Sequence, residues 1–159
     1  MAIADIIQTL VAHEVDFIVV GGMAAVLQGA PVHTIDLDIV YALSEPNITR
    51  LELALTELRA IFRDDPRRIV PNRSHLQSRG HKLLQTTAGP LDVLATIEMA
   101  TTFEDLLPDS DWLEIDGARF RVLSLARLIV VKEQLNRTKD QAMLVLLRAT
   151  LDELKKPRG

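Results

Sequence analysis

Apolar residues recur along the chain with two periods, one typical of helices and one typical of strands. Residues 2–13 carry an apolar side chain every three or four positions, which predicts an amphipathic helix. The β-branched runs at Phe17–Val20 and Leu37–Tyr41 predict two short buried strands. Residues 23–28, between these strands, predict a short helix.

Two pairs of strand-like segments flank turn residues and predict β-hairpins. They are residues 82–86 with 91–95 around Gly89-Pro90, and residues 112–115 with 118–122 around Asp116-Gly117. Asp-Gly is a strong hairpin signal because both positions tolerate a positive φ. Residues 63–80 are rich in arginine, proline, asparagine, serine and glycine, which predicts a loop.

Three more helices are predicted from residues that commonly cap helix N-termini. Ser44 precedes one, Ser124 opens another that runs to Leu135, and Thr138 opens the last, with Gln141 completing a capping box. We therefore expect one α+β (α/β) domain over residues 1–159, in which a mixed sheet carries packed helices and two helices close the chain.

The composition predicts an aliphatic core, because 48% of the 159 residues are hydrophobic but only 4% are aromatic. The lack of cysteine excludes disulfides, thiolate zinc sites and a cysteine nucleophile, and it fits a reducing cytosol. The N-terminus lacks the positive flank of a signal peptide, and no apolar run reaches the roughly 18 residues that span a bilayer. We expect a cytoplasmic protein with no membrane partner.

The charge is unevenly distributed along the chain, although the formal net charge is only −4. Residues 1–58 contain eight acidic residues and one basic residue, whereas residues 63–82 contain six basic and two acidic ones. An acidic N-terminal segment and a basic central segment suit a site that binds a metal and phosphates. Solvated surface charge explains the same asymmetry and stays open at this point.

Asp36 and Asp38 form the strongest local candidate for chemistry. In an extended Thr34–Val40 segment they lie on one face, while Ile35, Leu37 and Ile39 point into the core. Two such carboxylates repel each other unless a cation lies between them, and Mg²⁺ prefers carboxylates together with phosphate oxygens and waters. An exposed strand face without a metal is the alternative.

Two further features extend this candidate site. Gly21-Gly22 follows a buried strand and opens a helix, where free N–H groups can meet an anion, although a tight turn explains the glycines equally well. Asp92 is a lone acid in an apolar run, so it requires a partner or a function. If its strand lies beside the Asp36–Asp38 segment, three carboxylates converge.

The pattern of a strand, Gly21-Gly22, a short helix, T-I-D-L-D over Thr34–Asp38 and a later acid at Asp92 resembles the DNA-polymerase-β-like nucleotidyltransferase superfamily. It is most similar to small prokaryotic members, including nucleotidyltransferase toxins of toxin–antitoxin and abortive-infection systems. Residues 132–140 also resemble the lysine-bearing helical end of those proteins. The resemblance covers roughly residues 15–140 and implies the nucleotidyltransferase fold.

The resemblance implies transfer of a nucleoside monophosphate from a nucleoside triphosphate to a hydroxyl acceptor. Asp36, Asp38 and Asp92 would be the catalytic, metal-binding carboxylates for Mg²⁺ or Mn²⁺, with Asp92 as third ligand or base. The nucleotide would bind at a set of glycine, hydroxyl and basic residues: Gly21, Gly22, Thr34, Arg73, Lys132 and Lys139.

Several alternatives remain open from the sequence. Related proteins often carry arginine just before the Thr of this motif, where this chain has Val32 and His33. That departure keeps a catalytically silent nucleotide- or partner-binding protein in view. A toxin that modifies tRNA or protein, with an antitoxin partner, is a second possibility. A structural domain whose acids pair with arginines of residues 63–82 is a third.

Overall fold

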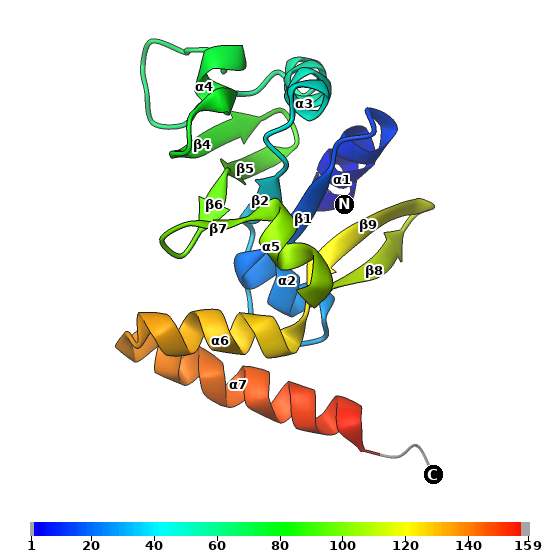
Figure 1. The fold of residues 1–159 in the computed structure, drawn as a ribbon, viewed down its shortest axis with the longest axis vertical. Coiled ribbons are helices and arrows are strands. Elements are labelled where there is room, and N and C mark those ends of the chain that lie inside the picture. Colours follow the sequence, from blue (N-terminus) through cyan, green and yellow to red (C-terminus); the bar gives the residue numbers. More distant parts are fainter. Residues whose placement is uncertain (1, 157–159) are drawn as a thin grey trace.

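The computed structural model describes residues 2–156, whose strands form one seven-stranded mixed sheet and a separate two-stranded hairpin (Figure 1). The strands are β1 (Phe17–Val20), β2 (Leu37–Tyr41), β3 (Ile61–Phe62), β4 (His81–Thr86), β5 (Gly89–Leu94), β6 (Thr96–Ile97), β7 (Thr101–Thr102), β8 (Ser110–Ile115) and β9 (Ala118–Leu123). The large sheet has the order β3-β4-β5-β2-β1-β9-β8, and β6 pairs with β7.

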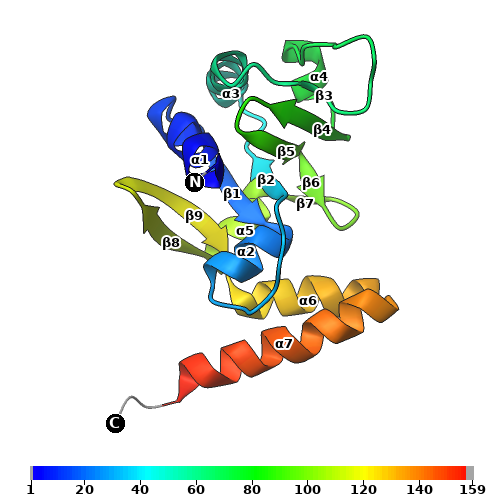
Figure 2. The ribbon, with the colours of Figure 1, turned by 180° about the vertical axis from the view of Figure 1, so that it is seen from behind.

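The helices lie around this sheet (Figure 2). They are α1 (Ala2–Ala12), α2 (Gly21–Leu27), α3 (Glu45–Glu57), α4 (Arg73–Gln77), α5 (Phe103–Leu106), the 3-10 helix η1 (Leu107–Asp109), α6 (Leu125–Leu135) and α7 (Thr138–Lys155). The first helix, α1, contacts α3 and β9, while α2 contacts β1, β2 and α6. None of the helices in residues 2–156 is long and apolar enough to cross a membrane.

The central strands are buried because they consist almost entirely of aliphatic residues. All four residues of β1 are buried, and β1 pairs antiparallel with β2 and parallel with β9. The strand β2 in turn pairs parallel with β5, which forms a hairpin with β4. This arrangement aligns the starts of β2 and β5 at the end of β1 where α2 begins.

Asn47 ties the first turn of α3 to the two central strands. Its side chain is fully buried, accepts a hydrogen bond from the Asp16 N–H at 2.6 Å, and donates to the carbonyl oxygens of Asp16 and Ala42 at 3.0 and 2.8 Å. A buried amide that satisfies three backbone groups stabilises the chain where β1 starts and β2 ends.

Most predicted elements are present, with three corrections. The extended segment before β2 is shorter than expected, and Ile35 is 68% exposed instead of facing the core, because β2 begins only at Leu37. The predicted loop over residues 63–80 contains the helix α4, capped by Asn72. The cap of α7 is Arg137, whose capping box closes through Asp140 and not through Thr138 and Gln141.

Candidate active site

The parallel pairing of β2 and β5 brings the second and third predicted carboxylates together. Asp38 and Asp92 are register partners on the two adjacent strands. Asp36 lies two residues before Asp38, is exposed, and its N–H donates to the Thr34 hydroxyl at 3.3 Å. Neighbouring strands lie about 5 Å apart, so Asp38 and Asp92 repel each other when both are ionised.

Asp38 is the most perturbed carboxyl group of this cluster. Burial, followed by the negative charge and closeness of Asp92, raises the pKa of Asp38 to about 7, from an ordinary value of 3.8. Its Oδ1 atom is buried and has no hydrogen-bond partner within residues 2–156. A buried carboxylate oxygen without a donor is costly, so this position suits a cation or a hydrogen-bond donor.

Gly21 allows α2 to begin directly against Asp38. Its φ is +67°, and a Cβ atom at this position would lie 2.6 Å from Asp38 Oδ2. Gly22 is less constrained, since a Cβ there would lie 3.4 Å from the Thr34 side chain. Only a glycine at position 21 lets the backbone come so close to the carboxylate.

Arg63 is an additional member of the site that no sequence motif distinguished from the other basic residues of 63–82. Its guanidinium donates to Asp92 Oδ1 at 2.7 Å and to the Leu84 carbonyl at 3.3 Å. The salt bridge is half-buried and neutralises Asp92 in part. Arg63 reaches this point because it follows the edge strand β3, which the hydrophobic pattern did not reveal.

A cleft of about 590 Å³ opens beside Asp38 and Gly21. Its walls come from the end of β1, the β6–β7 turn and one face of α6, and most of the lining side chains are apolar. Lys132 and His81 are its basic lining residues and Glu98 is an acidic one. Met99, at the tip of the β6–β7 turn, is 98% exposed and also lines the cleft.

Lys132 lines this cleft but also takes part in a buried ion cluster. Its ammonium donates to Asp140 Oδ1 at 3.2 Å, and the Arg137 guanidinium donates to Asp140 Oδ2 at 2.5 Å. These hydrogen bonds hold the pKa of Asp140 well below its usual range. The cluster fixes the turn between α6 and α7 and sets the position of Lys132.

Four of the six predicted nucleotide-binding residues, Gly22, Thr34, Arg73 and Lys139, do not line this cleft. Arg73 is on α4, where it forms a salt bridge with Glu45 and donates to the Thr49 hydroxyl at 2.8 Å. Lys139 is exposed in the first turn of α7. The structure thus groups Gly21, Asp38 and Lys132 around one cleft, and it places Arg73 and Lys139 elsewhere.

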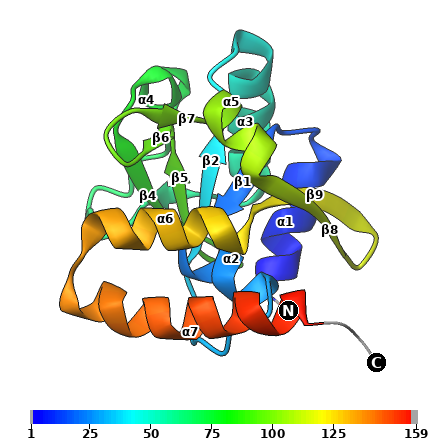
Figure 3. The ribbon, with the colours of Figure 1, turned by 60° about the horizontal axis from the view of Figure 1, so that its bottom comes forward.

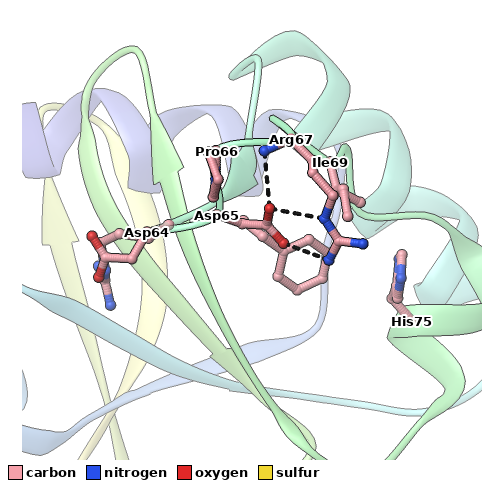
Figure 4. A pocket seen from close by; sticks show the side chains of 8 residues that line it. Asp64, Asp65, Pro66, Arg67, Ile69 and His75 are labelled. Atoms are coloured by element: carbon pink, nitrogen blue, oxygen red, sulfur yellow. Dashed lines mark hydrogen bonds and ion pairs between the residues drawn. The ribbon is translucent and has the colours of Figure 1, made fainter.

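Several basic side chains of residues 63–82 are engaged within the protein. Arg67 holds Asp65 at 2.8 Å beside an open cavity of about 720 Å³ that Phe62 and His75 also line (Figure 4). Lys82 is buried and donates to the Tyr41 hydroxyl at 2.9 Å and to the Ser78 carbonyl. Together with the pairs formed by Arg63 and Arg73, these contacts engage four of the six basic side chains of this segment, whereas Arg68 and Arg79 are exposed.

The carboxylates beside Gly21 provide the hard oxygen donors that suit a divalent cation. No group of three or more His, Cys, Asp or Glu side chains among residues 2–156 is arranged to hold a metal. The donor set of Asp36 and Asp38 nevertheless consists of carboxylate oxygens, and the unpartnered Asp38 Oδ1 is available to a cation. Mg²⁺ and Mn²⁺ favour such donors with phosphate oxygens.

The fold is that of nucleotidyltransferases. A Thermotoga maritima protein, TM1012, described as a candidate nucleotidyltransferase, superposes with a TM-score of 0.56 and 20% identity, covering 95% of this chain and 91% of that one. The antibiotic-resistance factor ANT(2'')-Ia superposes with a TM-score of 0.56 and 16% identity, covering 95% and 86%. No family model and no curated protein matches the sequence.

Proposed function

We propose that this protein transfers a nucleoside monophosphate from a nucleoside triphosphate to a hydroxyl acceptor with the help of Mg²⁺ or Mn²⁺. The observation that carries the proposal is the Asp38 carboxylate beside Asp92: its buried Oδ1 has no hydrogen-bond partner within residues 2–156, and its Oδ2 lies against the glycine bend at Gly21. Maintaining an ionised group at such a position costs stability, and such costs concentrate at functional sites.

In this proposal the acceptor hydroxyl attacks the α-phosphorus, the bond to the β-phosphate breaks and pyrophosphate leaves. Asp36 and Asp38 would hold a divalent cation, which would supply charge neutralisation for the phosphates. Asp92, on the neighbouring strand, accepts the hydroxyl proton after its salt bridge with Arg63 has opened. The first N–H groups of α2 face the phosphates, and Lys132 contributes a positive charge from the cleft wall.

The cleft supports an acceptor that is not a polyanion. Its walls are mainly apolar, and Glu98 adds a negative charge at its edge. The basic residues 63, 67 and 73 are bound to carboxylates, so they offer little to an RNA backbone. These contacts favour an acceptor hydroxyl on an uncharged, partly apolar molecule or on a protein side chain over one on a tRNA. The toxin and antitoxin hypotheses stay predictions.

One observation favours a second candidate, a catalytically silent nucleotide-binding protein. Arg63 donates to Asp92 Oδ1 at 2.7 Å, one of the two oxygens with which this carboxylate would act as a base or a third ligand. The motif also has Val32 where related proteins often have arginine. A silent protein would bind metal and triphosphate but would not release pyrophosphate.

The test measures melting temperature with Mn²⁺ or Mg²⁺, each nucleoside triphosphate, and both together. We expect stabilisation that requires metal and nucleotide, and its loss in an Asp36→Asn/Asp38→Asn variant. Asp116→Asn is a matched control, because it neutralises an exposed carboxylate in a hairpin turn that tolerates asparagine. A response that survives in the double variant would refute the site.

Pyrophosphate release then separates the enzyme from the silent binder. The purified protein is incubated with Mn²⁺, the stabilising triphosphate and hydroxyl compounds of graded polarity, and labelled nucleotide is traced to acceptor or protein. Metal-dependent binding without pyrophosphate release would support the silent alternative. Labelling of tRNA in preference to uncharged acceptors would contradict the acceptor class proposed here.

A further inference from the structure

The outermost helix, α7, is apolar on two opposite sides. Leu144 and Leu147 are buried on the side that packs on α6. On the far side, Ala142, Val145, Leu146 and Ala149 recur at spacings of three and four residues, and all four are exposed. A helix that needed only one partner would carry polar residues on this far side.

The position of α7 leaves this apolar stripe uncovered. In Figure 3, α7 runs along the outer side of α6, away from the sheet. Val145 is 66% exposed and Leu146 is 38% exposed, so the apolar surface is considerable at the middle of the helix. The two small alanines flank this middle and would let another helix approach closely.

The charges at the two ends of α7 indicate which occupant fits. Lys139 is exposed in the first turn, and Asp152 and Glu153 are exposed near the other end, where Glu153 already forms a salt bridge with Lys156 at 3.0 Å. Asp152 is therefore the acid of this end that forms no ion pair within residues 2–156. Two copies of α7 in parallel would place like charges together. In an antiparallel pair, Lys139 of each copy comes near Asp152 of the other.

The apolar stripe matches the same antiparallel register. With a two-fold axis between positions 145 and 146, Val145 and Leu146 face their own symmetry mates. Ala142 then lies opposite Ala149 of the second copy, and Lys139 lies opposite Asp152-Glu153 of that copy. An isologous contact of this kind closes on itself and produces a dimer instead of a filament.

We propose that this protein forms a homodimer through an antiparallel pair of α7 helices, producing a bundle of two α6 and two α7 helices. Two 18-residue helices bury an area near the lower limit of specific interfaces, roughly 1,200 Å². An interface of this size makes the dimer depend on protein concentration, and the concentration dependence of assembly measures its dissociation constant.

Sedimentation velocity of the full chain over a concentration series tests the dimer. We expect the wild type to shift from monomer to dimer and Val145→Asp to stay monomeric, with an unchanged circular dichroism spectrum because the side chain is exposed. Ala142→Ser is a matched control that changes the stripe little and keeps the dimer. A wild type that stays monomeric throughout, or a dimer that persists in Val145→Asp, overturns the proposal.

Charge reversal tests the antiparallel register. Lys139→Glu and the Asp152→Lys/Glu153→Lys pair should each weaken the dimer several-fold, because each places like charges opposite one another. Combining all three substitutions in one chain should restore the wild-type dissociation constant. Dimers that are unaffected by the single reversals, or that weaken further in the triple variant, overturn the antiparallel arrangement.

Discussion

Neutralising Asp38 without changing its shape should stabilise the metal-free protein. Asn has nearly the same volume, and Asp38 Oδ1 has no hydrogen-bond partner within residues 2–156 that an amide would lose. The pKa of this group rises from 3.8 to about 7 because burial and the charge of Asp92 penalise ionisation. Those three or so pKa units correspond to about 4 kcal/mol of unfolding free energy.

The sign follows from the direction of the shift. Because the pKa of Asp38 is higher in the folded than in the unfolded protein, its favourable contribution is complete below the unfolded value of 3.8 and is lost as the pH rises through 7. Asp38→Asn removes this loss. The unfolding free energy of the variant should therefore exceed that of the wild type by about 4 kcal/mol at pH 8.5. About 2 kcal/mol of this difference develops between pH 5.5 and 8.5.

Urea unfolding in the presence of a chelator measures this difference at pH 5.5, 7.0 and 8.5. The variant should show a higher midpoint at every pH, and the gap should widen as the pH rises, with m-values unchanged. Asp116→Asn, at an exposed position, should differ from wild type by a constant amount. A variant less stable than wild type, or a gap that does not depend on pH, would refute the electrostatic reasoning.

Three further predictions follow from contacts around the site. Gly21→Ala should lower the free energy of unfolding by about 1–3 kcal/mol, because the new Cβ atom would lie 2.6 Å from Asp38 Oδ2 at a backbone φ of +67°. An unchanged melting temperature would contradict this. Asn47→Ala removes three hydrogen bonds to buried backbone groups and should cost about 2–4 kcal/mol in urea unfolding, whereas a loss near zero would show that water replaces them. Arg63→Met leaves Asp92 without its cation, so the melting temperature should fall without metal and respond more strongly to Mn²⁺, and an equal or weaker Mn²⁺ response would contradict this.

The hydrophobic pattern predicted the central framework well. The strands Phe17–Val20 and Leu37–Tyr41 begin and end at the predicted residues, and Ser124 caps α6 as expected. Strong periodicity and local cap chemistry determine such elements, since they depend on neighbours in sequence. The two-residue strand β3 and the five-residue helix α4 escaped because neither is long enough to show the period of its own kind of element.

The sequence alone determined which residue types were available: two aspartates spaced by one residue, a glycine pair after a buried strand, and a later acid in an apolar run. Only the tertiary structure brings these residues together, because the paired strands β2 and β5 lie far apart in the chain. The parallel pairing of β2 with β5 placed Asp38 beside Asp92, and the edge strand β3 delivered Arg63 to the same point. Charges interact through space and not along the sequence, so the balance between carboxylates, arginine and burial that governs Asp38 exists only in the folded protein.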